Sequence, residues 1–266
     1  MINMEVIDFS LQISSEKFTT HLNVDTDYDS FPVIEDAWKT NEFFPMTSDF
    51  LRGLTACCRI AKSAKDYENV LKSIHLVDER IEASDGFRAV CYYVNTNTTD
   101  TLVSGQSILS ILKCKLASYT YTETDMYFKT DNDVFFVFPK NKNDEYGDRV
   151  YKITHDVDTK DAIPITNAGD LIAALSRVSI MADTFSTTKN KKVTFRFSTD
   201  QVKVLGESDL GNANETVKIA YQGNALQFAT CPDYVIEALE DTTQMVLSER
   251  LMFLFTPAYK CALVIQ

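Results

Sequence analysis

The side chains that could carry out catalysis are scattered through this sequence. Its three histidines, His21, His75 and His155, lack the spacing of a metal site. Asp78 and Glu79 are adjacent in an expected hairpin turn, where solvated carboxylates are more common than an acid–base pair. No glycine-rich phosphate loop or nucleophile elbow is present. The sequence therefore indicates a protein that is not an enzyme and uses no metal or cofactor.

Cysteine usage points to a reducing compartment. The six cysteines are Cys57, Cys58, Cys91, Cys114, Cys231 and Cys261. None forms a C-x-x-C pair, which argues against a zinc site and a disulfide framework and favours buried small hydrophobes. The N-terminus lacks the basic start of a secretory signal, and no apolar run is long enough to span a bilayer. We expect a cytoplasmic protein that does not interact with membranes.

Cations on the expected helices could attract phosphate. The net charge of −12 argues against a simple nucleic-acid binder unless acidic and basic surfaces are segregated. In a helix beginning at Thr47 or Ser48, Arg52 and Arg59 nearly coincide and Lys62 lies about 80° away, at about 100° per residue. The cations expected on or just after three helices are Arg52, Arg59, Lys62, Lys113, Lys115, Arg177, Lys189, Lys191 and Lys192. Any one alone fits a solvated helix face, but together in an acidic chain they favour a DNA-binding surface.

A fourth expected helix, at 233–240, does not follow this pattern. It carries Asp233, Glu237 and Glu240 and no cation. The lysines at 189, 191 and 192 would have to compensate for it.

One turn brings an aromatic residue and a cation together. Asp85-Gly86 lies between two hydrophobic runs, and glycine accepts the positive φ of a tight hairpin turn. Phe87 and Arg88 follow at once, so both are expected to be exposed at the mouth of the turn. An ordinary hairpin is the simpler interpretation of this stretch taken alone.

The hydrophobic pattern predicts an α+β chain. Expected strands are at 4–13, 17–24, 42–46, 71–78, 80–84, 87–94, 118–122, 125–130, 133–138, 149–153, 192–198, 201–206, 215–221, 244–247, 250–255 and 258–265. Expected helices begin at Thr47 or Ser48 and run over 106–115, 167–181 and 233–240. Residues 25–32 read as an acidic linker.

The chain repeats itself. Ile163-Pro164-Ile165-Thr166 parallels Phe44-Pro45-Met46-Thr47 at a period of roughly 120 residues. Each copy reads as strand, helix, three strands, helix, three strands, with the helices on one face of the sheet. This predicts two complete domains, 41–155 and 156–266, while residues 1–40 belong to neither copy.

Several short motifs occur in the order found in one known family. They are Ala83-Ser84-Asp85-Gly86-Phe87-Arg88-Ala89, the Phe31-Pro32 dipeptide before Glu35-Asp36, and Gly223 to Phe228 leading to Cys231-Pro232-Asp233-Tyr234-Val235. With the repeat, they resemble the DNA sliding clamps, above all the bacterial DNA polymerase III β-subunit, the polymerase processivity factor. That family has Ala-Thr-Asp-Gly-His-Arg-Leu at the turn. The likeness covers residues 4–266, and residues 1–40 resemble the closing strands of a clamp first domain.

The resemblance implies a DNA-clamp fold and a ring that encircles double-stranded DNA without reading its sequence. It implies as partners the replicative DNA polymerase and the clamp loader. Bacterial clamps have three domains per chain, so six domains would need three of these chains, a homotrimer, as in the clamps of some phages. A phage or mobile-element version is therefore expected. Strands 244–255 or the N-terminal hairpin are candidates for pairing between chains.

The resemblance also implies a groove for partner peptides between the two domains. Carried over residue by residue, it uses Leu71, Ser84, Gly86, Phe87, Arg88, Ala89, Tyr234, Leu251, Phe253, Lys260, Ala262 and Val264. Leu71, Leu251 and Val264 fit core positions equally well. Phe87 replaces the family's histidine and Lys260 an apolar residue, so the chemistry of the groove is expected to differ.

A second interpretation stays open. A chain with this fold could bind the partners of clamps without closing a ring, as a decoy or structural protein. Its signature would be a monomer in solution.

Overall fold

The structure is a computed structural model, and it describes residues 2–7, 10–23, 40–65, 69–141, 146–182 and 191–266. The chain divides into two compact units, Met1–Thr40 and Asn41–Gln266. Each unit is described by itself. The expected linker at 25–32 lies outside the described residues.

The first unit is a three-stranded antiparallel sheet in the order β1-β2-β3. Its strands are β1 (Asn3–Ile7), β2 (Ser10–Ser15) and β3 (Phe18–Asn23). The expected single strand at 4–13 is wrong, because β1 and β2 pair antiparallel from Asn3↔Ser14 to Ile7↔Ser10. A break in the alternation of apolar residues after Val6 is the trace of this reversal in the sequence.

The second unit begins with the first copy of the repeat. Its elements are β4 (Phe44–Pro45), α1 (Ser48–Ser63), a 3-10 turn at Asn69–Lys72, β5 (Ser73–Val77), β6 (Arg80–Ser84), β7 (Arg88–Tyr93), β8 (Thr101–Ser104), α2 (Gly105–Ile111), β9 (Leu116–Tyr121), β10 (Asp125–Thr130) and β11 (Phe135–Pro139). Thr47 caps α1, since its hydroxyl oxygen accepts from the Phe50 amide at 3.1 Å.

The second copy follows after α3 (Arg149–His155). It consists of β12 (Ile163–Pro164), α4 (Ala168–Ala182), β13 (Val193–Ser198), β14 (Gln201–Ser208), β15 (Gly211–Lys218), β16 (Leu226–Thr230), α5 (Pro232–Leu239), β17 (Gln244–Leu247), β18 (Leu251–Phe255) and β19 (Tyr259–Val264). The repeat is thus confirmed, but each copy has four strands between its helices and not three. The additional strands are β8 and β16.

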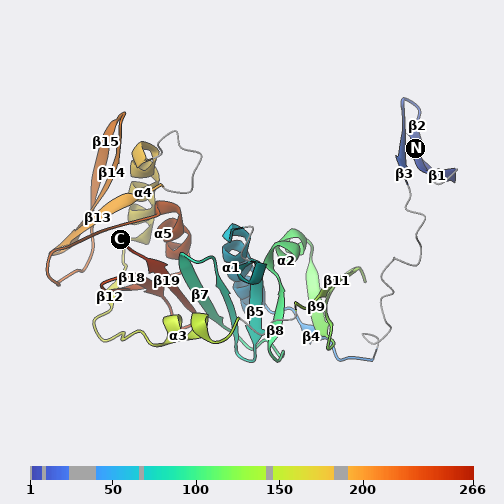
Figure 1. Cartoon of the computed structure of the whole chain (residues 1–266), viewed down its shortest axis with the longest axis horizontal. Coiled ribbons are helices and arrows are strands. Elements are labelled where there is room, and N and C mark those ends of the chain that lie inside the picture. The colour runs from blue at the N-terminus through green and yellow to red at the C-terminus, as the bar shows by residue number, and fades with distance from the viewer. Residues whose placement is uncertain (1, 8–9, 24–39, 66–68, 142–145, 183–190) are drawn as a thin grey trace. The chain divides into compact units, whose positions relative to one another are not determined.

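Three sheets carry the unit, and the largest joins the two copies. Its order is β12-β17-β18-β19-β7-β6-β5-β8, and β19 pairs with β7 from Tyr259↔Tyr92 to Leu263↔Arg88. The other two sheets have the orders β11-β10-β9-β4 and β15-β14-β13-β16. Figure 1 shows α1, α2, α4 and α5 on one side of the joining sheet and α3 on the other.

Successive side chains of a strand point to opposite faces of the sheet, and a hydrophobic core forms on each face of the joining sheet. Residues such as Leu54, Cys57, Ile81 and Val90 form the larger core, on the side of α1, and are fully buried. On the opposite side Tyr146 and Val150 cover Ala89, Leu102, Phe253, Phe255 and Ala262. The segment between the two copies, which contains Tyr146 and the helix α3, therefore packs against the sheet as a structural layer.

Residues 149–153 were expected to form a strand and instead open the helix α3. The helix buries Val150 and Thr154, which are four residues apart and so share one helical face. Packing against β7 and β19 overrides the strand preference of the β-branched residues in this stretch.

A polar network lies beside α3, on the same side of the sheet. Both ring nitrogens of His75 are hydrogen-bonded to carboxylates. Nδ1 lies 3.3 Å from Glu82 Oε2, and Nε2 lies 2.6 Å from Asp100 Oδ1. Glu82 is fully buried and also accepts from Arg80. Burial lowers the pKa of His75, but the two carboxylates outweigh it, so the pKa is raised above its ordinary value.

No helix within the described residues is long and apolar enough to cross a membrane.

Candidate functional site

The turn between β6 and β7 has the geometry expected from Asp85-Gly86. Gly86 has a φ of 84°, a conformation that L side chains rarely adopt. One carboxylate oxygen of Asp85 accepts from the amides of Phe87 and Arg88, each at 3.0 Å. This fixes the main chain at Phe87, whose side chain is 41% exposed.

Arg88 was expected to be an exposed cation, and that prediction is wrong. Its side chain is only 4% exposed. It donates to Asp85 Oδ2 at 2.9 Å, to Glu237 of α5, and to Ser63 of α1 at 3.1 Å. Its guanidinium carbon also lies 4.2 Å from the centre of the Tyr234 ring. Arg88 thus joins the two copies from inside and cannot present its charge to a partner.

The electrostatics of this network are those of a paired buried cation. Burial lowers the pKa of Arg88, but the Glu237 and Asp85 carboxylates outweigh it and the pKa is raised. The pKa of Tyr234 is raised to about 12, chiefly by burial and then by Asp85. Both side chains therefore keep one protonation state, cationic Arg88 and neutral Tyr234, across the physiological range.

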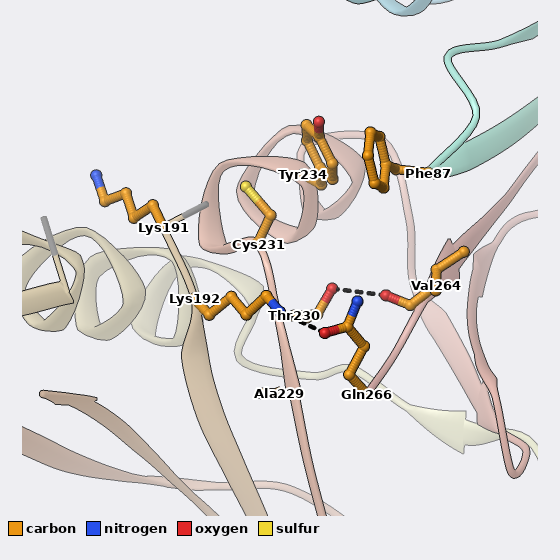
Figure 2. A pocket seen from close by; sticks show the side chains of 9 residues that line it. All are labelled: Phe87, Lys191, Lys192, Ala229, Thr230, Cys231, Tyr234, Val264 and Gln266. Atoms are coloured by element: carbon orange, nitrogen blue, oxygen red, sulfur yellow. Dashed lines mark hydrogen bonds between the residues drawn. The ribbon is translucent and has the colours of Figure 1, made fainter. Parts of the chain in front are cut away.

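A pocket lined by residues of both copies lies at Phe87 and Tyr234 (Figure 2). It encloses about 520 Å³ of empty space, counting the part that is open to solvent. Phe87, Tyr234 and Val264 supply its apolar wall, and Lys191, Lys192 and Gln266 supply polar groups. The rings of Phe87 and Tyr234 are 6.5 Å apart between centroids.

Only part of the predicted groove comes together here. Phe87, Tyr234 and Val264 line the pocket, and Ser84 and Gly86 shape the turn beside it. Ala89, Phe253 and Ala262 are buried beneath Tyr146 and Val150, and half-buried Leu251 packs against the same cluster. Half-buried Leu71 lies in the 3-10 turn, and Lys260 lies over the Tyr93 ring. The expectation that Ala89, Phe253 and Ala262 are open to a peptide is wrong, because the segment between the copies covers that face.

The pocket also contains residues that sequence reasoning did not assign to it. Lys191 and Lys192 were predicted to contact DNA, and Ala229, Thr230, Cys231 and Gln266 were not assigned to the groove. The position of Thr230 and Cys231 directly before Pro232, which opens α5, was the available signal.

The predicted DNA-binding cations differ in their surroundings. Arg52, Arg59 and Lys62 are exposed on α1, and Arg59 lies 3.6 Å from Glu240. Arg177 is held by two bonds of 2.6 Å to Glu215. Lys113 and Lys115 are exposed but follow the end of α2 at Ile111, so their placement on a helix face is wrong. Lys189 lies outside the described residues.

Of the two candidates for pairing between chains, the strands at 244–255 are not at an edge, whereas β1 and β3 are the edges of the N-terminal sheet. β18 has β17 and β19 on its two sides, and β17 pairs with β18 and β12. The strands at 244–255 are therefore unsuitable for ring closure. The edges of the two four-stranded sheets include β11 and β15, and exposed large apolar side chains directly precede both, Val134 before β11 and Leu210 before β15.

Comparison with known proteins agrees with this architecture. Residues 158–266 match the family model for the C-terminal domain of the DNA polymerase III beta subunit. The matched stretch contains the second copy of the repeat, from β12 to β19. The whole chain has the sliding-clamp fold. A search of curated proteins finds no match.

Solved structures of bacterial clamps resemble the chain. The DNA polymerase sliding clamp of Bacillus subtilis matches with a TM-score of 0.76 and 16% identity over 100% of this chain and 74% of its own. The beta subunit of DNA polymerase III from Thermotoga maritima matches with a TM-score of 0.74 and 19% identity, over 100% of this chain and 76% of its own. At these identities the likeness establishes the clamp fold, and the sites must be argued from this chain's residues.

Proposed function

We propose that this chain is a DNA sliding clamp, a non-catalytic processivity factor that encircles duplex DNA and tethers a polymerase. The observation that carries the proposal is the junction between the two copies. There, β19 of the second copy pairs with β7 of the first and makes one continuous sheet.

The repeat supplies the same two strands again at the edges of the unit. β11 holds the place in the first copy that β19 holds in the second, and β15 corresponds to β7. Both are edge strands. If β11 of one chain pairs with β15 of the next, each contact between chains repeats the contact within a chain. Such head-to-tail pairing makes a ring when the rotation closes, and six copies of the repeat need three chains.

Exposed Leu210 offers a direct test of the junction. A trimer of 30.1 kDa chains has a mass of about 90 kDa, which light scattering on a sizing column measures. A charge placed in an apolar contact between chains weakens it, so Leu210→Asp is expected to shift the protein to monomer at micromolar concentration. Ile153→Asp, at an exposed site on α3, is the matched control and should stay trimeric. A monomeric wild-type chain would favour the decoy alternative.

Retention by topology distinguishes a ring from ordinary DNA binding. Rings that have threaded onto a linear duplex should remain on it when both ends are then blocked, and leave when one end is freed. Simple phosphate contacts would depend on salt and not on the ends, because they release counterions. Equal retention on DNA with blocked ends and on DNA with a free end would refute the proposal that the protein encircles DNA.

The partners proposed for this clamp are the replicative polymerase and the clamp loader, docking through peptides at the pocket of Phe87, Tyr234 and Val264. Phe87 and Val264 are the lining side chains that combine apolar character with exposures of 41% and 39%. A peptide inserted in this concave site would bury them.

A further inference from the structure

The pocket between the two copies has an apolar corner. Phe87 and Tyr234 meet there at 36° between ring planes, and Val264 lies beside Phe87 (Figure 2). The main chain is tied at the same place, since the Val264 amide donates to the Phe87 carbonyl at 3.0 Å. Two rings and one aliphatic side chain around an open volume suit a large apolar side chain of a ligand.

The other side of the pocket is cationic. Lys191 and Lys192 directly precede β13 and line this side of the pocket. A third cation, Lys65, lies at the apolar corner, with its ammonium 5.5 Å from the centre of the Phe87 ring. No aspartate or glutamate is among the described residues that line it. The nearby carboxylate is that of Asp233, 3.8 Å from the Lys191 ammonium, and Lys192 donates to the neutral amide of Gln266.

This local charge is opposite in sign to that of the chain, which carries −12. A uniformly acidic surface would repel an acidic ligand, whereas cations grouped at one concave site attract it and fix its orientation. The pocket therefore combines two demands on its occupant, an apolar group and a negative charge beside it.

We propose that the pocket selects partner peptides in which acidic residues flank a large apolar side chain. This rests on the proposed function, and it identifies the chemistry of the partner at that site. The apolar side chain enters between Phe87, Tyr234 and Val264, and carboxylates on its flank contact Lys191 and Lys192.

Single-stranded nucleic acid is the other ligand that combines cations with aromatic rings. The pocket favours a peptide because Val264 and the tilted ring pair form a corner and not a flat stacking platform. Nucleic acid is therefore an outcome that the test must be able to report.

The test uses the full chain and two fluorescein-labelled peptides of ten residues. Both carry a central Leu-Phe pair. One has aspartates on both flanks, and its twin has asparagines. In fluorescence anisotropy at low salt the aspartate peptide should bind roughly fivefold more tightly, as two partly exposed charge pairs would give. High salt should reduce this preference, because it screens exposed charges.

Variants test whether Lys191 and Lys192 cause the preference for the aspartate peptide. The double variant Lys191→Gln/Lys192→Gln should bind the two peptides equally. Lys152→Gln, which removes an exposed cation of α3, is the control and should keep the preference. Phe87→Ala should weaken both peptides together.

Equal binding of the two peptides by the wild-type chain would overturn the proposal. So would displacement of the bound peptide by an oligothymidylate of similar length at equal concentration, which would assign the pocket to nucleic acid. The mass of the chain is measured in the same solution. A monomer that prefers the aspartate peptide refutes the ring and keeps this inference, whereas a trimer without the preference refutes the inference alone.

Discussion

Replacing Arg88 should destabilise the whole second unit, although Arg88 directly follows an exposed turn. The change Arg88→Met keeps most of the side-chain volume and removes the charge. It leaves the carboxylate of Asp85, which is 0% exposed, without its cation, and it also frees Glu237. Removing one partner of a buried ion pair costs about 3–5 kcal/mol, because the remaining charge stays desolvated. Asp85 keeps three other donors, two amides and the Ser63 hydroxyl, so we expect the lower end, about 3 kcal/mol.

Urea unfolding followed by circular dichroism, at one fixed protein concentration, measures this free energy. Arg177→Met removes an exposed arginine that is also bound to a carboxylate, and it should leave the midpoint unchanged. The double variant Asp85→Asn/Arg88→Met should be more stable than Arg88→Met alone, since it no longer buries an unpaired charge. A loss below about 1 kcal/mol for Arg88→Met would refute the view that this network holds the two copies together.

Three further predictions concern other parts of the fold. Protonation of His75 stabilises the folded chain, because the pKa of His75 is raised on folding. The free energy of unfolding should therefore fall as the pH rises from about 6.5, the ordinary pKa of histidine, through the raised pKa. In urea titrations at several pH values, His75→Gln should flatten this dependence. Gly206→Ala should lower the unfolding free energy by about 1–3 kcal/mol, since its Cβ would lie 2.3 Å from a main-chain oxygen of α4, whereas Gly169→Ala, with open space around it, should not; equal stabilities would contradict the close approach. When DNA affinity is measured at several salt concentrations, Lys62→Gln should reduce the slope of log K against log salt concentration by about 1. Arg177→Gln should reduce this slope by less, because the Glu215 carboxylate already holds that guanidinium. Equal reductions by the two variants would contradict this prediction.

The elements with regular apolar spacing could be predicted from the sequence. Helices α1, α4 and α5 carry a buried stripe, and the hairpin of β6 and β7 is marked by Asp85-Gly86. The repeat could be recognised for the same reason, since both copies bury equivalent positions. The short elements were missed. β8 has four residues after a polar loop, and α3 has seven residues whose burial comes from contacts with distant strands.

The site was harder to predict than the fold because its contacts are distant in sequence. Phe87 could be singled out by its place after the glycine. The burial of Arg88 could not, because it depends on Glu237, 149 residues further along the chain. The covering of Phe253 and Ala262 depends likewise on Tyr146, in a segment whose polar composition favoured a loop.

The network of Asp85, Arg88 and Glu237 affects how much conformational entropy is lost when a partner binds the pocket. Asp85 fixes the main chain at Phe87, and Arg88 holds the Tyr234 ring, so the main chain that carries Phe87 and the ring of Tyr234 are ordered when the chain folds and not when a ligand arrives. Binding then requires little further ordering of this chain, and the loss of conformational entropy falls on the incoming segment. A short flexible peptide can therefore hold to this surface with few contacts. Because such contacts break quickly, one partner can leave and another take its place while the chain stays where it is.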